Sequence, residues 1–107
     1  MKTRWLAAVL KRIHELISQG KVYFTLKALR ELAALDAGLD EEDARHVLAN
    51  LEAGDFVERA VSKKTGEWLY VFKPGVGGVG VYVKVVLRGD CIVISFHEDE
   101  GQINEDN

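Results

Sequence analysis

The sequence contains only one cysteine, one proline and one methionine among its 107 residues. A single cysteine, Cys91, excludes an internal disulfide, so a reducing cytoplasm is the expected setting. The chain also lacks an apolar run of the roughly 18–20 residues that a membrane span needs. Its basic and apolar start resembles a signal peptide, but Lys11, Arg12 and Glu15 interrupt the apolar stretch and favour an amphipathic helix. We therefore expect no membrane partner.

Motifs that hold metals or cofactors are missing as well. The sequence shows no Cys/His cluster at metal-ligand spacing, no phosphate-binding loop and no Ser-His-Asp arrangement. The glycine run GVGGVG at 75–80 leads into a strand pattern rather than a helix, which favours a flexible loop over a dinucleotide site. His14 and His46 lie on expected helices without ligand partners and are predicted to be structural. We expect neither a metal nor a small-molecule cofactor.

The charges are segregated along the chain, although the net charge is only −3. Residues 1–30 hold seven basic residues and one acid, and residues 59–97 hold six basic residues and two acids. The segment between them holds nine acids and one arginine. The basic segments either form one positive face or are solvated faces that cancel in space. The last segment, 98–107, has five acids and no base and is expected to be a disordered tail behind a single domain, 1–97.

The hydrophobic period changes from that of helices to that of strands near Gly54. Helical spacing predicts helices over 3–18, from a Thr25 cap to near Gly38, and from an Asp40 cap to Gly54, with Asp43 completing a near capping box. Residues 21–24 form a short extended piece. Period-two spacing then predicts strands over 55–62, 67–73, 81–88 and 91–97. The expected fold class is α+β, with N-terminal helices packed on one face of a C-terminal antiparallel sheet.

The last two expected strands form a hairpin whose register assigns side chains to faces. If residues 89–90 are a two-residue turn, Arg88 pairs with Cys91, Lys84 faces Ser95, and Tyr82 faces His97. The predicted polar face then carries these residues with Val86 and Val93, joined by Glu67 and Lys73 from the preceding strand. The predicted core face comprises Val81, Val83, Val85, Leu87, Ile92, Ile94 and Phe96.

The predicted polar face contains the side-chain types that metal-independent RNA cleavage needs. A base activates the ribose 2′-hydroxyl, cations stabilise the phosphorane, and an acid protonates the 5′-oxygen. His97 is the candidate acid or base, Lys84 and Lys73 are the candidate cations, and Tyr82 and Glu67 supply a phenol and a carboxylate. The alternative is an exposed polar face without chemistry.

Several segments in order resemble one toxin family. They are ALRELAALDAGLDEEDARHVLANLEAGDF, GEWLYVFKP, VYVKVVL and IVISFHEDE, and together they are similar to the MqsR family of motility quorum-sensing regulators. The resemblance implies a RelE-like fold and a ribosome-independent endoribonuclease, an mRNA interferase, that cleaves mRNA by attack of the 2′-hydroxyl. It also implies inhibition by a cognate antitoxin protein.

The resemblance also assigns roles to particular positions. The active tyrosine of the family matches Tyr82, and the lysine two residues later matches Lys84. The C-terminal catalytic lysine of the family aligns with His97, which can also donate a proton.

Two further positions depart from the family pattern. Glu58 stands where the family has a lysine, and Leu69 stands where it has a glutamine. Two consequences are open: either Lys73, Lys63 or Arg59 supplies the missing positive charge, or the activity is reduced. Glu58 is then a candidate for the base.

Two other functions remain open from the sequence. A non-catalytic module of the same fold would bind RNA or a protein through its polar face, and the departures at Glu58 and Leu69 favour it. A small-molecule enzyme would need a cofactor or substrate motif, and none is visible.

Overall fold

A computed structural model of the chain describes residues 4–36 and 38–99. Helices come first and strands follow, as the change of period predicts. The elements in chain order are α1 (Arg4–Ser18), β1 (Val22–Phe24), α2 (Leu26–Ala33), α3 (Glu41–Ala49), a short 3₁₀ helix (Ala53–Asp55), β2 (Phe56–Val61), β3 (Trp68–Phe72), β4 (Gly75–Val76), β5 (Val79–Leu87) and β6 (Cys91–Glu98).

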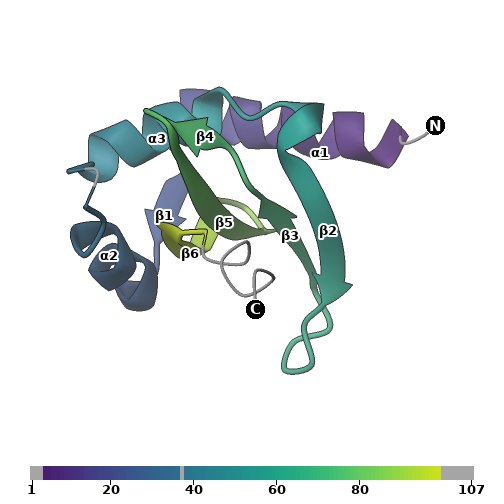
Figure 1. Ribbon diagram of the computed structural model, residues 1–107. Helices are drawn as coiled ribbons and strands as arrows, with labels where there is room; N and C mark the ends of the chain where they lie inside the picture. The colour runs from purple at the N-terminus through teal and green to yellow at the C-terminus, as the bar shows by residue number, and fades with distance from the viewer. Residues whose placement is uncertain (1–3, 37, 100–107) are drawn as a thin grey trace, which may run out of the picture.

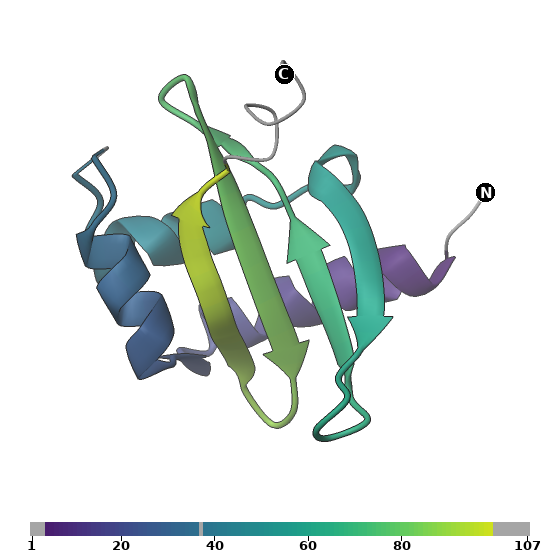
Figure 2. The ribbon, with the colours of Figure 1, turned by 60° about the horizontal axis from the view of Figure 1, so that its bottom comes forward.

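The strands form one mixed sheet in the order β1-β6-β5-β3-β2, with β4 pairing to β5. Helices α1 and α3 lie along one face of this sheet (Figure 1), while α2 stands beside β6 and β1 at one edge (Figure 2). The predicted α+β class is confirmed. The sheet is not purely antiparallel, because β1 runs parallel to β6, pairing Val22 with Cys91 and Phe24 with Val93. None of the helices described is long and apolar enough to cross a membrane.

Both predicted helix caps are confirmed. The Thr25 hydroxyl accepts a hydrogen bond from the Ala28 N–H at 3.1 Å, and Asp40 and Asp43 form a reciprocal capping box. The helices end earlier than predicted, α2 at Ala33 and α3 at Ala49. At the end of α3, the Asn50 side-chain amide donates to the His46 carbonyl at 2.7 Å, taking the acceptor that the backbone N–H of Asn50 would use in a continuing helix.

The glycine run is a β-hairpin and not the expected loop. Gly75 pairs with Gly80 and Val76 with Val79. The two residues of its turn, Gly77 and Gly78, have φ angles of 58° and 86°. This left-handed pair matches the tight turn whose twist suits antiparallel strands, which is why glycine occupies both positions.

The β5–β6 hairpin departs from the predicted register in two places that compensate. Leu87 pairs with Cys91, so the turn has three residues and Arg88 does not pair with Cys91. A bulge then adds one residue to β6 between Val93, which pairs with Val85, and Ser95, which pairs with Lys84. The predicted pairings of Lys84 with Ser95 and Tyr82 with His97 are therefore confirmed.

The bulge reverses the predicted faces of the first half of β6. Cys91 and Val93 are fully buried in the core with Phe96, whereas Ile92 and Ile94 are half-buried and lie outside the core cluster. The assignment of both isoleucines to the core and of Cys91 and Val93 to the polar face was wrong, because each residue before the bulge is shifted by one. Burial raises the pKa of the Cys91 thiol to about 12, in keeping with a packing role.

Val93→Thr tests this reversal, because threonine has nearly the same size as valine but places a hydroxyl in the core. We expect a loss of roughly 1–3 kcal/mol in the free energy of unfolding, measured by urea denaturation. Val61→Thr is the control on an exposed strand position, where 53% of the residue is accessible and little change is expected. Equal small effects of the two substitutions would place Val93 on the open face instead.

Candidate functional site

The sheet face opposite α1 and α3, here called the open face, carries a stacked pair of rings. The Tyr82 and His97 rings are nearly parallel, with an interplanar angle of 9° and centroids 4.8 Å apart. They stand on paired residues of β5 and β6, and both side chains are half-buried. The His97 Nδ1 lies 2.8 Å from the Glu98 carbonyl, which can only accept, so Nδ1 carries a proton and Nε2 is the nitrogen that can exchange one with a substrate.

Lysines lie on both sides of Ser95, one row along the sheet from the rings. Lys84 pairs with Ser95 across the hairpin, and its Nζ is 6.0 Å from the centroid of the Tyr82 ring. From α2, the Lys27 Nζ donates to the Ser95 Oγ at 2.8 Å. Lys27 was not among the residues selected from the sequence. No local pattern marks it, because its position beside β6 depends on how α2 packs against the sheet edge.

Lys73 already has an anionic partner. Its Nζ lies 3.3 Å from an Asp99 carboxylate oxygen, and 11% of the Asp99 side chain is exposed. The Asp99 backbone N–H also donates to the Gly80 carbonyl at 2.9 Å. Since β6 extends through Glu98, the first two residues of the expected tail are part of the folded domain. Residues 100–107 lie outside the described part of the chain.

Glu58 lies on the open face at its far side. It pairs with Val71 on β3, which in turn pairs with Lys84, so the two charged residues flank a buried valine. Glu58 and β6 are three strand spacings apart, roughly 14 Å. Lys84 lies between Glu58 and β6 in this row, and His97 stands two residues further along β6 than Ser95, the partner of Lys84. Leu69, the other departure from the family pattern, is half-buried on β3 and pairs with Ala60.

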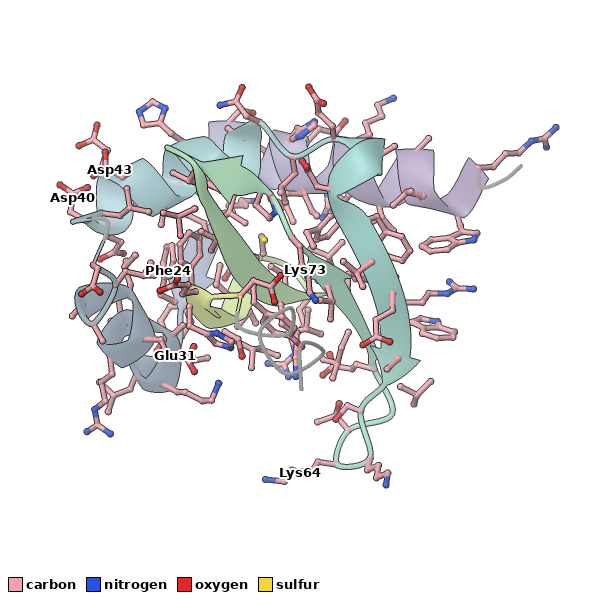
Figure 3. The ribbon with its side chains drawn as sticks, viewed as in Figure 1. Phe24, Glu31, Asp40, Asp43, Lys64 and Lys73 are labelled. Atoms are coloured by element: carbon pink, nitrogen blue, oxygen red, sulfur yellow. The ribbon has the colours of Figure 1, made fainter. Side chains whose placement is uncertain are left out.

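The structure does not bring Glu67 or Lys63 to this cluster. Glu67 accepts two hydrogen bonds from the Arg88 guanidinium, at 2.7 and 2.8 Å, at the turn end of the β5–β6 hairpin. Arg88 is six residues from Tyr82 along the chain, roughly 20 Å in a strand. Lys63 belongs to the loop between β2 and β3, and Figure 3 shows its neighbour Lys64 at the tip of that loop, far from Lys73.

Arg59 lies on the opposite face of the sheet. Its guanidinium carbon is 4.0 Å from the ring centroids of both Trp5 on α1 and Trp68 on β3. Arg59 pairs with Tyr70, a core residue, so it points toward the helices. This cation–π sandwich assigns Arg59 to packing between α1 and the sheet, and it cannot share a phosphate with residues of the open face.

A cavity of about 300 Å³ lies beside His97, between the end of α2 and the end of β6. Its lining includes His97, Glu31, Asp36 and Glu98. Burial alone would raise the pKa of Glu31, but hydrogen bonds from Lys27 and the Phe96 N–H and the positive charge of Lys27 lower it below the usual 4.5. Glu31 is therefore an anion at neutral pH. Among residues 4–36 and 38–99, no three metal-binding side chains are grouped to hold an ion.

One family of known proteins matches most of the chain. A family model described as motility quorum-sensing regulator, toxin of MqsA, matches residues 7–98. This range includes α1 from Ala7 onward, the whole sheet and every residue of the open face discussed above except Asp99. A search of curated proteins gave no significant match.

The Glu67–Arg88 pair predicts an unusual titration. Hydrogen bonds from Arg88 and then from Thr65 lower the pKa of Glu67 from 4.5 to about 2. Any stability that this pair provides is present above pH 4.5 and is lost as the pH falls toward 2. Carbon-13 NMR should therefore place the Glu67 midpoint near pH 2, and Arg88→Gln should return it toward 4.5. A midpoint near 4.5 in the unsubstituted protein would contradict the bidentate contact.

Proposed function

The chain belongs to the MqsR family of toxins and is thus the toxin of a toxin–antitoxin system, and we propose that it acts as a metal-independent endoribonuclease that cleaves mRNA. The observation that supports this most directly is the stacked Tyr82–His97 pair beside Lys84 on the open face. The family description names MqsA as the antitoxin, so the proposed protein partner is an antitoxin of that kind.

The proposed reaction uses side chains on both sides of one phosphate. Glu58 takes the proton of the ribose 2′-hydroxyl, and the 2′-oxygen forms a bond to phosphorus. Lys84 stabilises the charge that develops on the phosphorane oxygens. The bond from phosphorus to the 5′-oxygen breaks as His97 donates its Nε2 proton to that oxygen, which leaves a 2′,3′-cyclic phosphate and a 5′-hydroxyl.

The positive charge near this phosphate comes from residues that the fold brings together. Lys84 and Lys27 flank Ser95, and Lys73 directly follows β3 at the end of the sheet nearest the ring pair. The Tyr82 ring and the His97 ring also present a flat surface of the kind on which unpaired bases stack. Single-stranded RNA suits such a surface better than a duplex does, because its bases are free to stack.

A binding module without catalysis is the second candidate. Leu69 places a hydrocarbon where the family has an amide, and Lys73 is neutralised by Asp99. Such a module would bind RNA or the antitoxin through the same open face and leave the RNA intact.

Cleavage of RNA in the presence of a chelator tests the proposed activity. We expect the purified protein to cut mRNA in EDTA and to leave 2′,3′-cyclic phosphate ends. His97→Ala should lower the rate about 10²–10⁴-fold, because a positioned acid contributes that much. Tyr82→Phe should also lower the rate. The readout is the rate of product formation on a denaturing gel with mass spectrometry of the ends.

The matched control is His46→Ala, which removes an exposed histidine on α3, away from the sheet face. It should cleave at the unsubstituted rate. Undiminished cleavage by His97→Ala would remove His97 from the mechanism. Absence of cleavage over a wide range of RNA sequences, with antitoxin binding retained, would favour the binding module.

The Lys73–Asp99 ion pair predicts how salt affects RNA binding. Asp99→Asn frees Lys73 to contact a phosphate, so affinity should rise more at low salt than at high salt. One added phosphate contact should steepen the slope of log affinity against log salt by about 0.7. The measurement is a fluorescence anisotropy titration of a short single-stranded RNA with the catalytically reduced His97→Ala protein.

Asp90→Asn is the control for this experiment. It removes the same charge from the exposed turn at the opposite end of the β5–β6 hairpin. Its slope should equal that of the parent protein. An unchanged slope for Asp99→Asn as well would show that the Lys73–Asp99 pair does not compete with RNA.

A further inference from the structure

The outer edge of β6 changes partner after Val93, in the half of the strand that leads to His97. Strand β1 pairs with β6 only from Cys91 to Val93. Beyond Val93, where the bulge begins, the edge of β6 lies against α2 instead. The α2 segment makes four hydrogen bonds to four consecutive residues of β6. They are Thr25 N to the Val93 carbonyl at 3.0 Å, Thr25 Oγ1 to the Ile94 carbonyl at 3.4 Å, Lys27 Nζ to Ser95 Oγ at 2.8 Å, and the Phe96 N–H to Glu31 Oε1 at 2.9 Å.

Glu31 is the last of these contacts and lies closest to the ring pair. One of its carboxylate oxygens accepts from the Phe96 backbone N–H, and the other lies 2.8 Å from the Lys27 Nζ. The carboxylate is thus held at both oxygens, and 23% of its side chain is exposed. Figure 3 shows Glu31 on α2 next to the end of β6. This contact takes the place of a neighbouring strand for the residue directly before His97.

The bulge makes this contact more consequential than an ordinary edge hydrogen bond. At a bulge the hydrogen bonds between the two strands are locally disrupted. The register of the bulged strand therefore depends more on the other contacts that hold it in place. A slip of one residue at the bulge would turn His97 toward the core and away from Tyr82. The only described neighbour that bonds β6 on its outer side at Ser95 and Phe96 is α2.

We propose that Glu31 is a positioning residue for His97, acting through its hydrogen bond to the Phe96 N–H. This inference rests on the proposed ribonuclease function only for its effect on rate. Lys27 holds the Glu31 carboxylate in place. In this proposal helix α2 therefore helps to position His97, in addition to packing against the edge of the sheet. Glu31 does not touch the RNA in this proposal and takes no part in proton transfer.

Three substitutions test the proposal in the full-length protein. Glu31→Leu removes the acceptor but keeps a helix-forming side chain of similar bulk, and Glu31→Gln retains an oxygen that can accept from the Phe96 N–H. Glu41→Ala is the matched control, because it removes another i,i+4 ion pair, the 3.3 Å contact to Arg45 on α3, away from β6. The measurements are kcat and KM for RNA cleavage, hydrogen exchange of the Phe96 amide, and the NMR shifts of the His97 ring.

We expect Glu31→Leu to lower kcat about tenfold to a hundredfold, as misplacement of a reacting group does, with KM nearly unchanged. Glu31→Gln should recover most of the loss, and Glu41→Ala should match the unsubstituted protein. The Phe96 amide should exchange slowly in the unsubstituted protein and faster in Glu31→Leu. The His97 ring shifts should change more in Glu31→Leu than in Glu31→Gln, which shares only the loss of the negative charge near His97.

A kcat for Glu31→Leu equal to that of Glu41→Ala would overturn the proposal. Fast exchange of the Phe96 amide in the unsubstituted protein would overturn it without any substitution. If the unsubstituted protein does not cleave RNA, the ribonuclease proposal fails, and the exchange and ring-shift measurements then decide the positioning role alone. Unchanged ring shifts in Glu31→Leu would exclude that role.

Discussion

The bulge in β6 lets one strand place apolar side chains in the core and His97 on the open face. Before the bulge, Cys91 and Val93 fill the core between the sheet and the helices. After it, Phe96 still faces the core, while His97 faces the open side and stacks on Tyr82. Without the extra residue, a strand that points Val93 toward the core would also point Ser95 and His97 toward it, because side chains alternate strictly along a regular strand. The arrangement of the open face depends on this single irregularity.

Two cations of the open face are paired with anions of the same chain. Lys73 is paired with Asp99, and Lys27 with Glu31. A phosphate that binds Lys73 or Lys27 therefore replaces the carboxylate that each lysine already contacts. Such exchange makes binding depend on the local geometry of each pair as well as on the total charge, which is −3 for the chain.

The two faces of the sheet use basic side chains for different purposes. On the helix side, Arg59 lies between two tryptophans and joins α1 to β2 and β3. At the turn end of the hairpin, Arg88 is held by the Glu67 carboxylate. Of the basic side chains described above, Lys84, Lys27 and Lys73 lie near the ring pair on the open face. The net charge of a sequence segment therefore overestimates the positive surface. It counts basic residues such as Arg59 and Arg88, whose side chains already pack against aromatic rings or bind a carboxylate.

Apart from β4 and the short 3₁₀ helix, the sequence by itself determined the classes and order of the elements and both capped helix starts, because capping and periodicity are local. It also placed Tyr82 opposite His97, although through two errors of register that cancelled. The tertiary structure alone decided the faces of Cys91, Val93, Ile92 and Ile94, since a bulge is specified by contacts on both sides of the strand. It also brought Lys27 and Glu31 to the site and took Arg59 and Glu67 away from it. Those placements depend on how α1, α2 and the hairpin turn pack against the sheet, and residues far apart in the chain set that packing.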